Sequence, residues 1–162
     1  MTTTETPWLT DREQRVWRQW VRATSALPAE LNRHLQQEHS LSLQDYEVLV
    51  WLTDVETGQI RMSDLADMLH WDRSRLSHHI TRMTSRGLVE RRQCPEDGRG
   101  AFVAIIDQGR RSIEAAAKRH VDGVRALLFN GMTEAELAAL ESVTARVLER
   151  LDVPTRPADA QA

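Results

Sequence analysis

A stripe of mainly apolar residues runs through the first forty positions at alternating intervals of four and three, the spacing of one helical face. The stripe consists of Val16, Trp20, Thr24, Leu27, Leu31 and Leu35. It follows "TDRE" at residues 10–13, which has the form of a helix capping box. The pattern therefore predicts a long helix over about residues 11–37. Pro28 lies inside it and predicts a kink near the preceding turn.

Helix start and stop signals divide the middle of the chain. Ser42 is the expected cap of "YEVLVWL", which we expect to end at Gly58, and Ser63 is the expected cap of "DLADML". Asp72 precedes "RSRLSHHITRMTSR", a helix that Gly87 is expected to end. After it, "LVERRQC" and "AFVAII" predict two strands of a hairpin, which we call the wing.

Two more helices are expected in the last third of the chain. One begins at Asp107 and runs to about Asn130, and the other follows the capping box "TEAE" and runs to about Asp152. The predicted fold class is mostly α with a small β-hairpin wing. Residues 42–106 have the element order of a winged helix-turn-helix, and the flanking helices are candidates for dimerisation.

The charges are unevenly distributed. The whole chain has a net charge of −3, but residues 73–99 carry seven arginines against three acidic residues, a local charge of +4 that leaves −7 on the rest. A basic segment on an acidic body favours one directed electrostatic surface. A solvated arginine-rich face with no partner is the alternative.

The helix after Asp72 has two distinct faces. Leu76, Ile80 and Met83 lie within about 60° of one another at the 100° per residue of a helix, and form an inward stripe. The outer face is expected to carry Ser74, His78 and Thr81, with Arg75 and Arg82 beside them. No acidic residue occurs between positions 73 and 86. Hydroxyl, imidazole and guanidinium groups suit phosphate oxygens and base edges in a major groove. We call this segment the recognition helix.

The wing presents a basic tip. Arg99 lies between Gly98 and Gly100, and a guanidinium there suits the narrow, electronegative minor groove beside the recognition helix. Asp97 is either a partner that orients Arg99 or a plain turn former. Arg91 and its neighbour at position 92 point to opposite faces of a strand, so only one is expected to face DNA.

The sequence resembles the MarR family of bacterial transcriptional regulators over residues 10–152. The most specific part is "GLVERRQCPEDGRGAFVAI", in which "GLVER" and "DGR" match the family's strand and wing. The resemblance implies a homodimer with one DNA-binding lobe per subunit, and repression relieved by a small aromatic or phenolic molecule. It places Ser74, Arg75, Ser77 and His78 at groove-reading positions and Arg99 at the wing tip. The chain departs from the family at Gly98, where a second basic residue is common, and at "IDQG", which replaces a leucine–threonine helix start.

Together these arguments predict a DNA-binding set and a division of the chain. The set is Ser63, Arg73, Ser74, Arg75, Ser77, His78, Thr81, Arg82, Arg91 and Arg99, with Asp97 and Gly98 shaping the wing. The predicted parts are an arm and dimerisation helix (1–38), the winged domain (39–106), the C-terminal dimerisation helices (107–153) and a flexible tail (154–162). The rival hypothesis is a winged-helix module that binds a protein and not DNA.

The terminal helices carry more apolar residues than a winged domain of about 65 residues can cover. Interleaving with a second copy would bury them and would place two recognition helices about one DNA turn apart on a pseudo-palindromic operator. A monomeric helical bundle is the alternative. Trp17, Trp20, Arg22 and Trp51 are candidates for an effector pocket, although tryptophans at helical spacing also occur in cores and interfaces.

Other classes of function find less support. Glu30 and His34 are four residues apart on one helix face, and Glu38, His39 and His120 could join them. No spacing requires a metal, and we expect neither a metal nor a cofactor. Cys94 is the only cysteine, lies beside arginines that could activate it, and leaves a redox role open. Because no catalytic constellation, membrane-length apolar run or secretory signal occurs, we expect a cytoplasmic protein that is not an enzyme and not a membrane protein.

Overall fold

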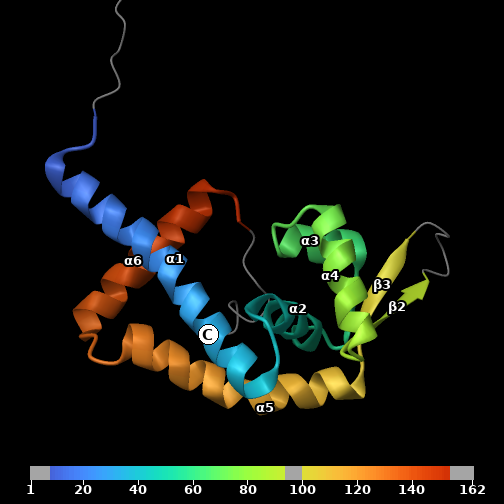
Figure 1. Cartoon of the computed structure of the whole chain (residues 1–162). Coiled ribbons are helices and arrows are strands. Elements are labelled where there is room, and N and C mark those ends of the chain that lie inside the picture. Colours follow the sequence, from blue (N-terminus) through green and yellow to red (C-terminus); the bar gives the residue numbers. More distant parts are fainter. Residues whose placement is uncertain (1–7, 94–99, 154–162) are drawn as a thin grey trace, which may run out of the picture.

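The computed structural model describes residues 8–93 and 100–153. Two lobes are visible in Figure 1: α1 and α6 cross at one end, the winged lobe lies at the other, and α5 runs between them. The elements are α1 (Asp11–His39), α2 (Leu43–Asp54), β1 (Gln59–Arg61), α3 (Met62–Met68), α4 (Arg73–Ser85), β2 (Val89–Gln93), β3 (Ala101–Ile105), α5 (Asp107–Val124), a π-helical turn η1 (Arg125–Phe129) and α6 (Glu134–Arg150).

Side-chain caps begin four of the helices where the sequence predicted them. Thr10, Ser42 and Thr133 each form a complete capping box with the acidic residue three positions later. Asp72 accepts a hydrogen bond from the backbone N–H of Arg75 at 2.8 Å, at the start of α4. These caps satisfy amide groups that a helix N-terminus otherwise leaves without partners, so local sequence alone defines these starts.

Several boundaries differ from prediction. Helix α2 ends at Asp54, and Gly58 instead adopts a left-handed conformation (φ 63°) in the turn before β1. Ser63 does not cap α3, which begins one residue earlier at Met62 without any side-chain cap. Asp107 is the first residue of α5 and not its cap. The short strand β1 was not predicted, because three residues carry too little periodicity to identify a strand.

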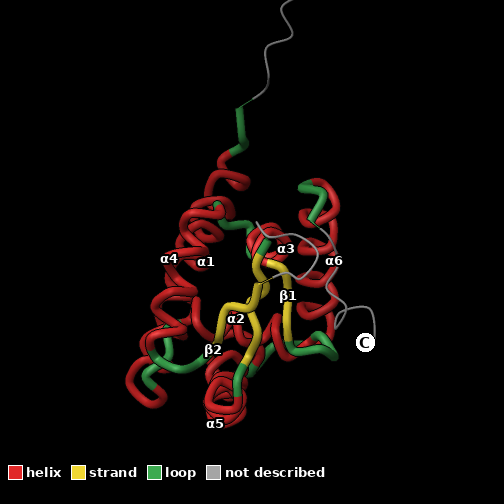
Figure 2. The backbone as a smooth tube through the Cα atoms, turned by 90° about the vertical axis from the view of Figure 1, so that its right-hand side faces the viewer, coloured by secondary structure: helices red, strands yellow, loops and turns green. Residues whose placement is uncertain are grey.

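The predicted hairpin is part of a three-stranded antiparallel sheet in the order β1–β3–β2 (Figure 2). Val103 on β3 pairs with Ile60 on β1 and with Arg91 on β2. Ile60 and Val103 are buried, so these three side chains share the sheet face that packs on the core. The Arg91 side chain therefore lies on the core-facing side of the sheet, but in the part of β2 where this face is exposed.

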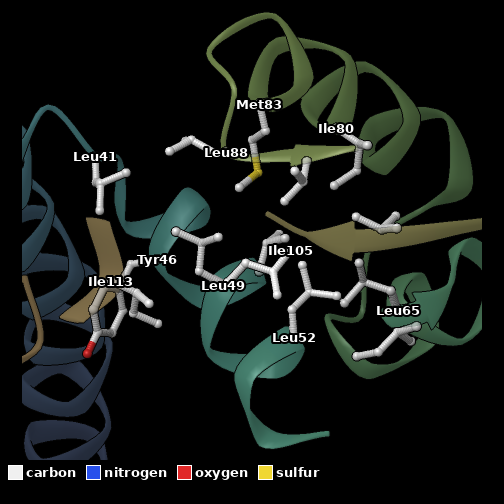
Figure 3. Packing of buried hydrophobic residues seen from close by; sticks show 14 of the residues in the cluster. Leu41, Tyr46, Leu49, Leu52, Leu65, Ile80, Met83, Leu88, Ile105 and Ile113 are labelled. Carbon is white, nitrogen blue, oxygen red and sulfur yellow. The ribbon is translucent and has the colours of Figure 1, made fainter. Parts of the chain in front are cut away.

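The core lies in the winged lobe, between α2, α4 and the sheet (Figure 3). Leu49 and Leu52 from α2 meet Ile80 and Met83 from α4, and all four are fully buried. Ile113 connects α5 to the same cluster. Within the described residues, no helix is long and apolar enough to span a bilayer.

The helices outside this lobe bury little of their apolar surface. Helix α6 has no buried residue, and α1 has none before Leu31. The exposed apolar side chains of these helices include Val16, Trp17, Trp20, Val21, Leu137, Val143, Val147 and Leu148. The boundaries predicted between the four parts of the chain stay a prediction.

Candidate nucleic-acid interface

The core fixes which face of α4 is presented to solvent. The predicted inward stripe is confirmed, since Leu76, Ile80 and Met83 are all fully buried. The opposite face is therefore turned outward, and Ser74 and His78 on it are exposed. This face rests on a rigid support, because both α2 and the sheet pack behind it.

Among the described residues, the predicted interface occupies three segments of the winged lobe, namely α3, α4 and β2. Six of them are exposed on α4: Arg73, Ser74, Arg75, His78, Thr81 and Arg82. Ser77 is half-buried on α4, Ser63 is half-buried in the first turn of α3, and Arg91 is exposed on β2. Arg99, Asp97 and Gly98, like Cys94, lie outside the described residues.

Arg91 connects the wing to α4. Its Nη2 donates hydrogen bonds to the backbone carbonyl of Ser77 at 2.6 Å, to Ser77 Oγ at 3.1 Å and to Thr81 Oγ1 at 3.1 Å. Arg92 points to the other side of the sheet and pairs with Glu90, with Nε 2.8 Å from the carboxylate. Sequence reasoning placed Arg91 in contact with DNA but missed that it holds two other residues of the predicted interface.

Arg75 is held by an aromatic residue that sequence reasoning did not select. Its guanidinium lies over the Trp71 ring, 4.4 Å from the ring centroid. Such cation–π contacts stabilise a guanidinium while leaving its edge free to donate hydrogen bonds. Trp71 immediately precedes the cap of α4, and its position one turn before an arginine was the only available signal.

Asp45 forms a buried polar centre beneath the interface. Its carboxylate accepts hydrogen bonds from Arg86 Nη1 at 2.7 Å and from the Ser42 backbone N–H at 2.8 Å, and His79 Nε2 lies 3.1 Å away. Burial raises the pKa of Asp45, but the hydrogen bonds from His79, Arg86 and Ser42 outweigh it and hold the pKa well below its usual range. The carboxylate is therefore ionised, and it fastens α4 to the start of α2.

The predicted effector residues are not brought to one site. Trp51 lines a cavity of about 330 Å³ between α1, α2 and α5, together with Tyr46, Glu47 and His120. Trp20 instead lines a larger apolar cavity of about 870 Å³ between α1, η1 and α6. Trp17 and Arg22 line neither of these two cavities. Trp20 and Trp51 therefore line different cavities of this chain, because helical spacing cannot show which neighbouring helix each ring meets. The predicted set of effector residues stays a prediction.

The candidate metal ligands are engaged with other groups. His34 Nε2 lies 3.0 Å from Glu30, as the four-residue spacing indicated, but Glu30 also pairs with Arg33. Glu38 accepts two hydrogen bonds from Arg119, at 2.9 and 2.8 Å. In the part of the chain that the structure describes, no three His, Cys, Asp or Glu side chains are grouped so that they could hold a metal ion.

The geometry defines the class of protein. A capped recognition helix, a preceding short helix and a three-stranded sheet in which β2 and β3 form the wing constitute a winged helix-turn-helix. The sequence model of the MarR family matches residues 39–100, most of this lobe.

Known proteins extend the match to nearly the whole chain. AbsC, a MarR family transcriptional regulator from Streptomyces coelicolor, is 36% identical; the alignment covers 92% of this chain and all of AbsC, with a TM-score of 0.85. Sco3205, a MarR family regulator from the same organism solved in complex with DNA, is also 36% identical, with 92% and 93% covered and a TM-score of 0.87. The HTH-type transcriptional regulator YdgJ of Bacillus subtilis is 33% identical over 94 residues, which are 58% of this chain and 57% of YdgJ.

The chain belongs to the MarR family of transcriptional regulators. The resemblance seen in the sequence is thereby confirmed, and so is the predicted fold class. The chain spans little more than half the length of the Bacillus relative, whereas it matches both Streptomyces structures almost from end to end. Members of this family are transcription factors and not enzymes.

Proposed function

We propose that the protein is a homodimeric repressor that binds a pseudo-palindromic operator in cytoplasmic DNA and is released by a small phenolic effector. The observation that carries the DNA-binding part is the acid-free outer face of α4. From position 73 to 86 the chain has four arginines and no carboxylate, although its net charge is negative. The DNA complex of Sco3205 supports this proposal by likeness.

The proposed interface has two parts. Helix α4 enters the major groove with Arg73, Ser74, Arg75, His78 and Arg82 outward, and Ser63 contacts the backbone beside it. Arg91 braces Ser77 and Thr81, which sets the angle between the wing and α4. The wing tip at Arg99, outside the described residues, is the proposed minor-groove contact.

The exposed apolar faces of α1 and α6 support the homodimer. Leu137, Val147 and Leu148 on α6 are each at least 40% exposed, and so is Trp20 on α1. Large apolar side chains exposed in this number are unfavourable in water and are typical of an interface. In the proposed dimer, a second copy buries these side chains by interleaving its own α1 and α6 with those of the first. The twofold axis of such a dimer would set the two α4 helices about 34 Å apart, which is one turn of DNA.

The small cavity beside Trp51 is the proposed effector site. Burial lowers the pKa of His120, so its imidazole is neutral at pH 7, and its Nδ1 has no hydrogen-bond partner among the described residues. That nitrogen suits a hydroxyl donor. Glu47 lines the same cavity and no arginine or lysine does, so an aromatic carboxylate meets repulsion there. A neutral phenol therefore fits the lining better than an anionic ligand.

Selection from a random pool of duplex DNA tests the DNA-binding proposal. We expect a twofold-symmetric site, whose affinity falls steeply between about 50 and 200 mM salt because arginines displace counterions. Arg75→Ala should weaken binding by about 1–3 kcal/mol. Arg111→Ala, on α5, is the matched control for the loss of one positive charge. Recovery of no duplex would instead favour the protein-interaction module.

Titration of the protein–duplex complex tests the effector. Phenol and benzoate, matched in ring size, are added to the complex, and release by phenol alone is expected. His120→Phe keeps the ring stacked on Tyr46 but removes the acceptor, so it should abolish release while leaving DNA affinity unchanged. Equal release by benzoate would contradict the assigned chemistry of the cavity.

A further inference from the structure

A chain of polar contacts crosses α4 from its buried side to its exposed side. His79 is 7% exposed, and its Nδ1 lies 3.0 Å from Nη2 of Arg82, one turn further along the helix. On the other side of the ring, Nε2 lies 3.1 Å from Oδ1 of Asp45, at an angle bent away from an ideal hydrogen bond. The imidazole therefore connects a buried carboxylate on α2 with an arginine on the outer face.

The chemistry of the partners determines where the proton lies. A guanidinium has only donors, so His79 Nδ1 accepts from Arg82 and carries no proton. The proton then lies on Nε2, which faces the ionised carboxylate of Asp45 at 3.1 Å without the geometry of a hydrogen bond. The two contacts thus define the tautomer of His79, with Nδ1 facing a donor and Nε2 facing a carboxylate.

Other contacts hold this arrangement in place. The Trp71 ring meets the His79 ring edge-on, with centroids 5.2 Å apart and planes at 83°. Asp45 stays fixed without His79, because Arg86 and the Ser42 backbone bond its other oxygen. The His79 ring is consequently held by Trp71 on one side and Asp45 on the other, so Arg82 is bonded to a constrained group.

From this geometry we infer that His79 is a positioning residue for DNA binding, which holds the Arg82 guanidinium in the orientation that meets the phosphate backbone. The inference rests on the proposed DNA-binding function. Arg82 uses Nη2 for His79, and the inference assigns its other guanidinium nitrogens to the phosphate. A long side chain that is already ordered loses less entropy on binding than a free one. Sequence reasoning counted Arg82 as a contact but gave His79 no role.

The test compares substitutions at both ends of the contact. His79→Leu fills the buried volume but bonds neither partner, whereas His79→Gln supplies an acceptor for Arg82 and a donor for Asp45. Each variant is made alone and in an Arg82→Ala background. Affinity is measured for a duplex selected on the wild-type protein, and thermal unfolding is recorded in parallel.

His79→Leu should weaken binding by about two- to tenfold, the cost of ordering one long side chain. His79→Gln should restore most of that loss. In the Arg82→Ala background His79→Leu should change affinity no further, because the residue that it positions is absent. An equal loss in both backgrounds, or no rescue by glutamine, would show a purely structural role and overturn the inference.

A measurement on the wild-type protein needs neither DNA nor a stable leucine variant. Nitrogen-15 NMR of the histidine rings reports the tautomer of His79, and we expect a proton on Nε2 and none on Nδ1. Arg82→Met should shift the His79 Nδ1 resonance by removing its donor. A proton on Nδ1 would overturn the inference, since Arg82 cannot then donate to it. If the selection recovers no duplex but the tautomer of His79 is as expected, the DNA-binding proposal fails, whereas the contact between His79 and Arg82 is supported.

Discussion

Asp45→Asn removes the charge at the centre of the contacts that join α4 to α2. The asparagine side chain can keep the bonds from the Ser42 backbone and Arg86 on its one oxygen, but its amide group then turns a donor toward His79. Hydrogen bonds to a buried charge contribute about 1.5–3 kcal/mol each. The Arg86 side chain is 40% exposed, so its share is reduced by solvent, whereas the His79 side chain is only 9% exposed. We expect a loss of about 2–4 kcal/mol in the free energy of unfolding.

Urea unfolding at pH 7 and a fixed protein concentration measures this loss. For a chain of this size it corresponds to a melting temperature lower by about 6–12 °C. Asp67→Asn is the matched control, since Asp67 is exposed on α3 and its substitution should change stability by less than about 0.5 kcal/mol. A loss below about 1 kcal/mol for Asp45→Asn would refute the reasoning.

The difference in unfolding free energy between the wild type and Asp45→Asn should depend on pH in a defined direction. The folded pKa of Asp45 lies below the unfolded value of about 3.9, so its stabilisation is complete above that pH and is lost as pH falls toward the folded pKa. The difference between wild type and Asp45→Asn should be constant from pH 7 to about 5 and should narrow below about pH 4. A difference that stays equal at pH 3.5 would contradict the assignment.

Three further substitutions test other contacts. Gly109→Ala should destabilise the protein by about 2–3 kcal/mol in thermal unfolding, because the added Cβ would lie 2.1 Å from the Leu88 carbonyl oxygen; unchanged stability would argue against this packing. Arg91→Met should weaken binding of the selected duplex by about 1–2 kcal/mol with little change in the melting temperature. Unchanged affinity would contradict the proposal that Arg91 fixes the wing against α4. Leu148→Asp should yield monomers in sedimentation; a persisting dimer would place the interface elsewhere.

Local sequence was sufficient for the elements that depend on neighbouring residues. Capping boxes defined the starts of α1, α2 and α6, and the spacing of Leu76, Ile80 and Met83 identified the buried face of α4. Both depend on residues three or four apart, a distance at which the helix itself brings side chains together. The strand β1 could not be predicted in this way, because it forms only by pairing with β3, more than forty residues later in the chain.

The amino-acid sequence by itself determined the order of helices, the acid-free face of α4 and the family. Only the tertiary structure decided which side chains hold that face in place. Arg91 bonds Ser77, and His79 lies between Asp45 and Arg82. It also separated Trp20 from Trp51, which helical spacing had grouped. The physical reason is that helical periodicity gives the direction of a side chain, while its partner depends on how distant segments pack.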